Sequence, residues 1–531
     1  MTNLKGDIKK ILGTLPLTAE VDFMLRRRGE ALRGFRLERL ENSLADWARQ
    51  TEASPFRGQA GKKVFIFSTL PYWIEHAALM GLGLAGLGHK VTLAYMPWRN
   101  WYKTVNDYDL RQYNLYSKQQ FKPAEGLLSP VSFVDVKQKK ALPAELEAEI
   151  RQVSLRDVQY TDQLETVDLQ SELYQLRLAR NLPLAEKALA WLENRRPDVI
   201  IVPNGLILEF GVIYQVGKHL GIPVVSYEFG EQRDRIWLSD GREVMIQDTA
   251  QMWSGRKHKP FGEEQLQKIQ TLFSARAGAD LWNNFYRKWQ DQPSEGGAAA
   301  REKLDLDDRP VVLLAANVIG DSLTLGRQIF TGSMTAWLEN VLAYFNTHDH
   351  AQFVLRAHPG ERNMEGPSVM DVARQILPDA PDHFRLLGPD APVNTYDLMQ
   401  IADLGMTYTT TVGMEMAMSG VPVIVVGDTH YRGKGFTLDP SSWEEHEKML
   451  DEALGDPARF KPSEAQVQTA WQYAYRFFFD YPQAFPWHLI HLDEGIENWP
   501  LSEVLTADGL AKFKNTFDQL TGESVDWDGM E

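Results

Sequence analysis

Short apolar runs alternate with amphipathic stretches along most of the chain. The first half contains four runs that we predict to be buried strands: KVFIFS (63–68), KVTLAYM (90–96), VIIVPN (199–204) and IPVVSYE (222–228). A helical pattern lies between the first two runs, and another lies between the last two. Repeated strand–helix–strand units predict a parallel sheet.

The second half repeats this alternation. Its predicted strands are VVLLAAN (311–317), AQFVLRAHP (351–359), FRLLG (384–388), LGMTYT (404–409) and VPVIVVG (421–427). Helical stretches separate most of these strands. Between the two series, the segment at 290–309 has the composition of a linker. Two α/β series joined by a linker predict two Rossmann-like domains that face a central cleft.

The pattern therefore indicates the α/β fold class. We expect a helical extension at 1–60, an N-terminal domain at 61–290, a C-terminal domain at 310–485 and a helical tail at 486–531. A polar, aromatic-rich stretch at about 100–195 is interpreted as a largely helical insertion in the N-terminal domain. In such sheets, ligands bind beyond the carboxyl ends of the strands, so polar residues there are the first candidates for a site.

Composition narrows the function. A chain of 531 residues exceeds what one hydrophobic core usually organises, which agrees with two domains. The absence of cysteine excludes disulfides, cysteine-ligated zinc and a thiol nucleophile, and it indicates a reducing cytoplasm. No segment approaches about 18 consecutive apolar residues, so we expect neither a signal peptide nor a membrane span. A net charge of −16 argues against a nucleic-acid partner.

One stretch departs from the acidic balance. FMLRRRGEALRGFRLERL (23–40) is basic and amphipathic. Such a stretch is typical of peripheral contact with an anionic membrane surface or an acidic partner. A solvated helical face is the other interpretation, and it is the one we favour.

A glycine motif at GLGLAG (81–86) matches the dinucleotide-binding fingerprint, but its position does not. The fingerprint needs its glycines directly after a strand and at the start of a helix. Here they follow a whole predicted helix and precede the strand at 90–96. We therefore expect no NAD or FAD cofactor, and interpret the glycines as positions where the helix packs closely on the sheet and then ends.

RAHPGE (356–361) places an arginine and a histidine at the end of a predicted core strand. Arg356 and His358 stand two residues apart, so the pleat points both side chains to the same face. Arginine offers a planar fork for phosphate oxygens, and histidine can donate a hydrogen bond to a phosphate, base or ribose. Alternatively, Arg356 pairs with a nearby carboxylate and His358 is a structural strand-end residue.

TYTTTVGMEMAMSGVPVIVVG (407–427) reads as strand, threonine-rich turn, helix and strand. Hydroxyls such as those of Thr410 and Thr411, together with free backbone N–H groups, favour an anion at a helix start. At least one of the threonines is also expected to cap the helix. Gly413 would let a ligand approach the backbone. Glu415 lacks the spacing of a capping box, because Val412 stands three residues before it, and its carboxylate suits a ribose diol.

Carboxylates also follow a predicted strand in the first half. In SYEFGEQRDR (226–235), Glu228 still belongs to the strand and Glu231 lies in the following loop. A partly buried carboxylate at a strand end suits a general base, and solvated loop charge is the competing interpretation, above all for Glu231. Other candidates at strand ends are Asn317 on the nucleotide side, and Ser68, Thr69 and Glu75 on the acceptor side. Each of these could equally be structural.

Taken together, five motifs resemble those of the bacterial capsule polysaccharide biosynthesis glycosyltransferases. The motifs are R-x-H-P (356–359), N-x-Y-D-L (394–398), T-T-x-G-x-E (410–415), G-x-P-V-I (420–424) and Y-E-x-G (227–230). That family has the GT-B fold and includes the Kdo transferases that start capsule chains on lipid. The resemblance covers the second domain well and the first thinly, and the insertion at about 100–195 has no match in it.

The resemblance implies transfer of a sugar from a CMP-, UDP- or GDP-sugar donor to a hydroxyl of a surface glycan or glycolipid, without metal or cofactor. It implies that Arg356, His358, Thr410, Thr411 and Glu415 hold the donor nucleotide, and that Glu228 is a candidate acid or base. The usual serine near position 410 is threonine here, which leaves the nucleotide open. The alternatives are a polyol-phosphate transferase of the teichoic-acid type, a sugar-nucleotide epimerase and a non-catalytic nucleotide-sugar-binding protein.

Overall fold

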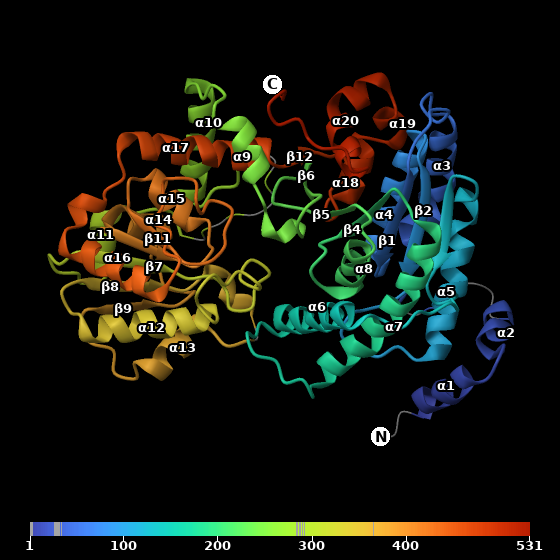
Figure 1. Ribbon diagram of the computed structural model, residues 1–531, viewed down its shortest axis with the longest axis horizontal. Coiled ribbons are helices and arrows are strands. Elements are labelled where there is room, and N and C mark those ends of the chain that lie inside the picture. Colours follow the sequence, from blue (N-terminus) through green and yellow to red (C-terminus); the bar gives the residue numbers. More distant parts are fainter. Residues whose placement is uncertain are drawn as a thin grey trace. The chain divides into compact units, whose positions relative to one another are not determined.

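The computed structural model describes residues 4–25, 32, 34–282, 285, 288, 290, 292–364 and 366–530. It is an α/β protein with two separate, mainly parallel sheets, and its chain divides into two compact units (Figure 1). The first unit comprises Met1–Asp157, Asp168–Met245 and Gln483–Val525, and the second comprises Val158–Val167, Ile246–Pro482 and Asp526–Glu531.

This division differs from the ranges expected from the sequence. Residues 246–290 lie with the second unit rather than the first, and residues 483–525 return to the first unit. The change at residue 246 comes after the last strand that the first part of the chain adds to its sheet.

The first unit is built on a seven-stranded sheet in the order β12-β6-β5-β4-β1-β2-β3. Its strands are β1 (Lys63–Thr69), β2 (Lys90–Met96), β3 (Leu128–Ser132), β4 (Val199–Pro203), β5 (Val224–Glu228), β6 (Arg235–Ser239) and β12 (Gln483–Ala484). The strands from β1 to β5 pair in parallel, whereas β6 and β12 are antiparallel additions at one edge. The order changes direction between β1 and β4, which is the switch point of a doubly wound sheet.

Helices cover this sheet, and their bounds follow the sequence signals. α4 begins with Pro71, a residue suited to the first turn because its missing N–H has no partner there. α5 is capped by Asn106, whose side chain accepts a hydrogen bond from the N–H of Asp109. The helices of this unit are α1 (Leu4–Thr14), α2 (Thr18–Leu25), α3 (Glu38–Glu52), α4 (Pro71–Gly86), α5 (Asp107–Phe121), most of α6 (Ala144–Asp162), α7 (Glu172–Arg195), α8 (Leu208–His219), α18 (Leu492–Asn498), α19 (Leu501–Val504) and α20 (Ala507–Leu520).

The stretch at 100–195 is largely helical, as expected, but it also supplies a strand. β3 forms the edge of the sheet beside β2 and contains Pro130, whose ring cannot donate to a ladder. A short run with a proline gives a weak strand signal, which explains why the sequence pattern missed it. β6 was missed for a similar reason, because it is a short run that follows the charged loop after Glu228.

The interpretation of the GLGLAG glycines, close packing on the sheet and then the end of the helix, is confirmed for Gly81 and for the helix end, whereas Gly83 and Gly86 face the C-terminal segment. A side chain at Gly81 would meet Leu128 at 3.2 Å, on the sheet beneath α4. A side chain at Gly83 would meet the ring of Trp487 at 3.2 Å, and one at Gly86 would meet Leu505 at 2.5 Å. The glycines therefore let α4 lie between the sheet and the returning C-terminal segment, and the helix ends at Gly86.

The second unit is built on a five-stranded parallel sheet in the order β11-β10-β7-β8-β9. Its strands are β7 (Val311–Ala315), β8 (Gln352–Arg356), β9 (Phe384–Leu387), β10 (Leu404–Thr407) and β11 (Val423–Val425). All five were predicted from their apolar runs. The order again changes direction, between β7 and β10, so the carboxyl ends of these two strands mark the expected place of a ligand.

The helices of the second unit include α12, which has a Ser333 cap and packs its apolar face into the core through Trp337 and Leu338. They are α9 (Ala250–Arg256), α10 (Glu263–Ala277), α11 (Gly297–Lys303), α12 (Met334–Thr347), α13 (Val369–Ile376), α14 (Thr395–Ile401), α15 (Val412–Met418), α16 (Trp443–Gly455) and α17 (Glu464–Tyr475).

The segment expected as a linker lies within the second unit. Its alanine-rich middle forms α11, and its start is held by Asp397 of α14. The carboxylate of Asp397 accepts hydrogen bonds from the N–H groups of Glu295 and Gly296 at 2.9 and 3.0 Å. Asn394 donates to the carbonyls of Ala277 and Gln292 at 2.9 and 2.7 Å. In the N-x-Y-D-L motif, these two polar residues therefore bind backbone of this unit.

Candidate functional site

The carboxyl edge of the second sheet carries a small pocket beside the β7–β10 switch point. It is lined by residues that follow β7, β8 and β10 and by the start of α15, including Arg356, His358, Thr410, Thr411 and Glu415. Its volume is about 60 Å³, several times the roughly 10–15 Å³ that a single water molecule needs. The pocket within this unit therefore has room for a small anionic group.

Arg356 ends β8 and is almost completely buried, with 4% of its surface exposed. Its Nη1 donates to the carbonyl of Gly388 at 2.6 Å, while its buried Nε has no hydrogen-bond partner among the described residues. Arg356 makes no ion pair with any described residue. Asp390, which acts on it electrostatically, is paired with Arg362 at 2.9 Å. The salt-bridge alternative for Arg356 is therefore not what the structure shows.

Burial is the main influence on this guanidinium. It lowers the pKa of Arg356 to about 10, with a further contribution from the positive charge of Arg362. Arg356 remains charged at neutral pH, and a buried charge without a partner is costly unless an anion compensates it.

His358 lies on the rim of the same pocket and is exposed. Its Nδ1 accepts a hydrogen bond from the N–H of Gly360 at 3.0 Å. In the neutral ring this places the proton on Nε2, which is then a donor. Arg356 and His358 thus reach one pocket, as their spacing predicts.

The threonine-rich turn differs in detail from the expectation. Thr411 occupies the N-cap position of α15, but its side chain makes no capping bond. Thr410 Oγ1 accepts from the N–H of Val412 only at 3.5 Å, the outer limit of a hydrogen bond. Thr409 is structural, because its Oγ1 donates to the carbonyl of Leu323 at 2.8 Å. The expected threonine cap is therefore weak at most, and the hydroxyls of Thr410 and Thr411 line the pocket.

Glu415 forms a buried ion pair with Arg276 of α10. Arg276 Nη1 lies 3.1 Å from Glu415 Oε1, and the two side chains are 4% and 2% exposed. The guanidinium also lies over the rings of Phe273 and Phe478, at 5.2 and 5.4 Å from their centroids. Arg276 lines the same pocket and was missed from the sequence, because no motif marks it and it comes from a distant helix.

Two residues expected to bind nucleotide have structural roles. A side chain at Gly413 would meet Tyr431 Oη at 2.3 Å and Thr407 Oγ1 at 2.7 Å, so the glycine makes room for a tyrosine rather than for a ligand. Asn317 Oδ1 accepts from the N–H of Thr409 at 3.1 Å and so holds the turn after β10. Neither residue is among those that line the pocket.

In the first unit, Glu228 ends β5 near the β1–β4 switch point. Its Oε2 accepts a hydrogen bond from Asn204 Nδ2 at 3.2 Å, and its Oε1 accepts from the N–H of Phe229 at 3.1 Å. Burial raises the pKa of the Glu228 carboxyl, and these two hydrogen bonds oppose that shift. A carboxyl with a raised pKa at this position is chemically suited to accept a proton.

Asn204 is a positioning residue that the sequence did not reveal. It follows β4 with a left-handed backbone at φ +56°, a conformation that asparagine tolerates better than most residues. Its N–H donates to the carbonyl of Tyr227 at 2.8 Å, which fixes it beside the end of β5. The feature that marks Asn204 is its positive φ angle, which cannot be seen in a sequence.

The acceptor-side candidates are more constrained than expected. Ser68 and Thr69 end β1 and are fully buried. Thr69 Oγ1 donates to the carbonyl of Met96 at 3.0 Å, while Ser68 Oγ has no hydrogen-bond partner among the described residues. Glu75 accepts from the N–H of Arg39 at 2.8 Å and pairs with its guanidinium at 3.1 Å. Glu231 is half-buried in the loop after Glu228.

The basic stretch at 23–40 lies partly outside the described residues, which omit 26–31 and 33. Its described ends belong to α2 and to the start of α3. Throughout the described part of the chain, every helix is too short or too polar to cross a membrane.

No protein-family model and no curated protein sequence matches the chain. Among solved structures, a Thermosulfurimonas dismutans protein, KpsC, beta Kdo 2,4 transferase, is 15% identical, with a TM-score of 0.35, over 54% of this chain and 82% of that one. The UDP-GlcNAc 2-epimerase from Neisseria meningitidis bound to UDP-GlcNAc is 13% identical, with a TM-score of 0.24, over 79% and 99%. The wall teichoic acid polymerase TagF is 10% identical, with a TM-score of 0.20, over 94% and 98%. Similarities of this size assign neither substrate nor reaction to the chain.

Proposed function

We propose that this protein is a glycosyltransferase that moves a sugar from a nucleotide-activated donor to a hydroxyl of a surface glycan or glycolipid. The observation that carries the proposal is Arg356, a buried and charged guanidinium that has no acidic partner among the described residues. Its position at the carboxyl end of β8, next to the β7–β10 switch point, is where doubly wound sheets bind ligands.

The surroundings of Arg356 suit phosphate oxygens. The Gly388 carbonyl fixes one end of the guanidinium, and Nε lacks a hydrogen bond. The hydroxyls of Thr410 and Thr411 and the ring of His358 line the same pocket and add polar groups around it. Arginine binds phosphate through charge-assisted hydrogen bonds, which are roughly twice as strong as neutral ones.

In sugar transfer, negative charge grows on the nucleotide phosphate as it departs. Donors that are already fixed in a dry site stabilise such charge without reorganising. Arg356 would supply the positive charge, so the proposed reaction proceeds without a metal. Glu228 of the first unit would accept the proton of the acceptor hydroxyl, a step for which its raised pKa suits it.

The donor half of the proposal is tested by thermal shift with CMP, UDP, GDP and CDP compounds. We expect one nucleotide class to raise the melting temperature of the wild-type protein, because a ligand stabilises the state it binds. Arg356→Ala should lose that shift while the ligand-free protein melts close to wild type. Arg374→Ala is the matched control, since Arg374 is exposed on α13. An undiminished shift in Arg356→Ala, or no shift with any compound in the wild type, would refute the proposal.

The transfer half is tested with the donor identified in this way. Incubation of donor alone and of donor with candidate acceptors separates the reaction classes. Release of nucleotide only when an acceptor is present supports a glycosyltransferase. Conversion of the sugar nucleotide without an acceptor would instead indicate an epimerase, and tight binding without turnover would indicate a binding protein.

A further inference from the structure

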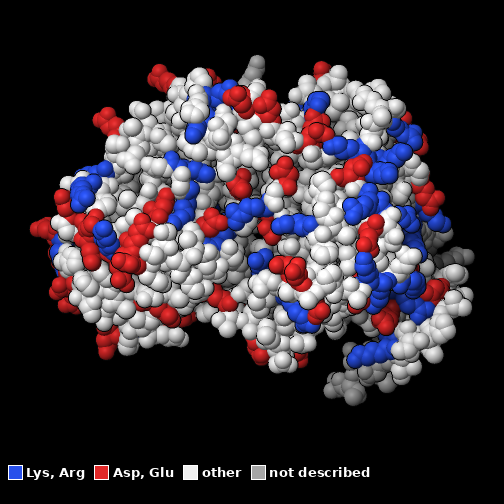
Figure 2. Space-filling view, in the orientation of Figure 1, with Lys and Arg blue, Asp and Glu red and all other residues white. Residues whose placement is uncertain are grey.

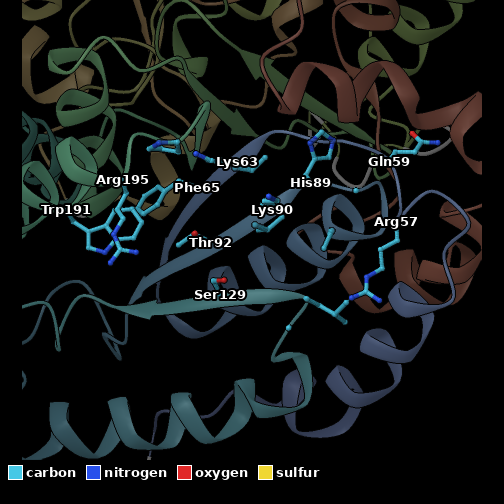
Figure 3. Close-up of a pocket in the computed structure, with 17 residues that line it drawn as sticks. Arg57, Gln59, Lys63, Phe65, His89, Lys90, Thr92, Ser129, Trp191 and Arg195 are labelled. Atoms are coloured by element: carbon cyan, nitrogen blue, oxygen red, sulfur yellow. The ribbon is translucent and has the colours of Figure 1, made fainter.

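The first unit has an open pocket of about 630 Å³ at the amino ends of β1, β2 and β3 (Figure 3). This is the edge of the sheet opposite to Glu228. The pocket is lined by the loop before β1, the starts of β1 and β2, the turn after α4, the chain around β3 and the last turn of α7. Nothing in the proposed sugar transfer uses it.

The pocket is lined by four Lys and Arg residues: Arg57, Lys63, Lys90 and Arg195. None of its lining residues is acidic. Figure 3 shows Arg195 toward one side and Arg57 toward the other, with the two lysines between them. The chain as a whole has a net charge of −16, so a pocket lined by four positive and no negative side chains is unusual in it. On the face shown in Figure 2, Lys and Arg side chains also gather over the first unit.

These four side chains are exposed, and none forms an ion pair with the part of the chain that is described. Their neighbour Lys62 is different. Its Nζ pairs with Glu523 and donates to the carbonyl of Thr521 at 2.9 Å. The unit therefore pairs the side chain of a lysine next to the pocket with a carboxylate, whereas the four cationic side chains inside the pocket form no ion pair with a described residue. Near Lys63, the carboxylate of Asp198 accepts a hydrogen bond from the backbone N–H of Lys63 at 2.7 Å.

The strand register brings two of the charges together. Lys63 of β1 is paired with Lys90 of β2, so their side chains stand side by side on one face of the sheet. Like charges on directly neighbouring strand positions are destabilising. Both positions are exposed and begin a strand, so packing does not require a lysine at either one. A bound anion would turn this repulsion into attraction.

Helix dipoles account for only part of the cluster. α7 ends at this edge, and a cation in its last turn interacts favourably with the negative end of the dipole. Arg195 has that position and lies over the ring of Trp191, 5.3 Å from its centroid. Arg57 is in a loop, and Lys63 and Lys90 begin strands, so their charges do not belong to a helix end.

Neutral hydrogen-bonding groups complete the lining. Thr92 of β2 is paired in register with Ser129 of β3, two positions along from Lys90, so both hydroxyl side chains lie on the face of the two lysines. Charges spread along the pocket with hydroxyls beside them match a ligand that bears several oxyanions, rather than one small ion.

We infer that this pocket binds an elongated ligand carrying at least two oxyanions, either the carboxylates of an acidic saccharide chain or the phosphates of an oligophosphate. Lys63 and Lys90 hold one anionic group between them, and Arg195 and Arg57 bind groups toward either side. The inference stands apart from the proposed sugar transfer, because it uses no residue of the second unit and no residue at the Glu228 edge.

The test is calorimetric titration of the full-length protein with trigalacturonate, inorganic tripolyphosphate and maltotriose as the uncharged control. We expect one anionic probe to bind, more weakly as salt is added, and maltotriose not to bind. Lys63→Gln/Lys90→Gln should weaken binding about tenfold or more, since two charge-assisted contacts are lost. Arg356→Ala should keep the binding that Lys63→Gln/Lys90→Gln loses, because Arg356 does not line this pocket. Any tripolyphosphate binding that only Arg356→Ala removes belongs to the nucleotide pocket, which separates the two sites.

Lys103→Gln/Lys137→Gln is the matched control, because it removes the same charge from exposed lysines outside the pocket. It should bind the probe nearly as tightly as the wild type. Equal losses in the two double variants, unchanged binding in Lys63→Gln/Lys90→Gln or no binding of either anion at low salt would each overturn the inference. Without ligand, Lys63→Gln/Lys90→Gln should melt no lower than wild type, so a loss of binding cannot be ascribed to unfolding.

Discussion

Arg276 Nη1 lies 3.1 Å from Glu415 Oε1, and both side chains are almost fully buried. The pair joins α10 to α15 at the pocket that contains Arg356. Removing one partner leaves an uncompensated buried charge, which costs about 3–5 kcal/mol. We therefore expect Glu415→Ala to lower the unfolding free energy of the second unit by roughly that amount, as measured by urea denaturation followed by tryptophan fluorescence.

Replacing both residues of the ion pair separates the effect of packing on stability from the effect of an unpaired charge. Arg276→Met/Glu415→Leu should recover much of the stability lost in the single variant, because no unpaired charge remains. If Glu415→Ala unfolds at the same urea concentration as the wild type, the ion pair does not stabilise the unit.

Glu228 and Asn204 give a prediction about pH. Glu228→Gln removes the proposed proton acceptor, so turnover should fall about 10²–10⁴-fold, while donor binding measured by thermal shift stays unchanged. Asn204→Gly keeps the left-handed backbone but removes the hydrogen bond that favours the charged carboxylate.

The pKa of Glu228 should then rise further in Asn204→Gly. A base acts when it is deprotonated, so the acid limb of the pH–rate profile should move to higher pH. Full activity at the alkaline plateau is the internal control. An acid limb at the wild-type position would show that Asn204 does not tune Glu228.

The raised pKa of the buried Glu361 predicts that the stability of the protein depends on pH. It accepts from the N–H of Val369 at 3.2 Å, and burial, its main influence, raises its pKa from 4.5 to about 7. The folded state therefore holds a proton more tightly than the unfolded state, so this residue's contribution to stability is present below about pH 4.5 and is lost as pH rises through about 7.

Glu361→Gln should melt at a higher temperature than wild type at pH 8, where the wild-type carboxyl must be charged or take up a proton. Near pH 4.5 the two proteins should melt within a few degrees of each other. The difference is measured by thermal melts across that pH range. A constant difference at all pH values would mean that Glu361 does not titrate in this way.

The close packing of Tyr431 against Gly413 predicts that substitutions at the two positions are coupled. The Cβ of Gly413→Ala would come within 2.3 Å of Tyr431 Oη, so the variant should lose about 1–3 kcal/mol of stability. Tyr431→Phe removes that oxygen and also the hydrogen bond that it donates to the Thr410 carbonyl. In a double-mutant cycle, Gly413→Ala should cost less on the Tyr431→Phe background. An equal cost on both backgrounds would rule out the contact as its cause.

The strands of the second sheet follow directly from the sequence, because parallel strands buried on both faces leave continuous apolar runs. Candidates such as Arg356 and His358 could be placed from strand ends and the pleat. Arg276, which pairs with Glu415, and Asn204, which binds Glu228, could not be predicted from the sequence. Both reach their sites through tertiary packing. The edge strand β3 was missed because Pro130 weakens its signal. The residues at 290–309 resembled a linker because Asp397, which holds their start, is far away in the sequence.

The return of the chain to the first unit has a consequence for its synthesis. His76 is buried in this unit, where its Nε2 donates to the carbonyl of Trp487 at 2.9 Å, and β12 closes the edge of its sheet beside β6. Domains generally form in the order in which they leave the ribosome. Here residues 483–525 emerge only after nearly all of the second unit. The unit that is translated first is therefore completed only near the end of synthesis, and a nascent chain that stops before residue 483 should expose the apolar face of α4 to chaperones and proteases.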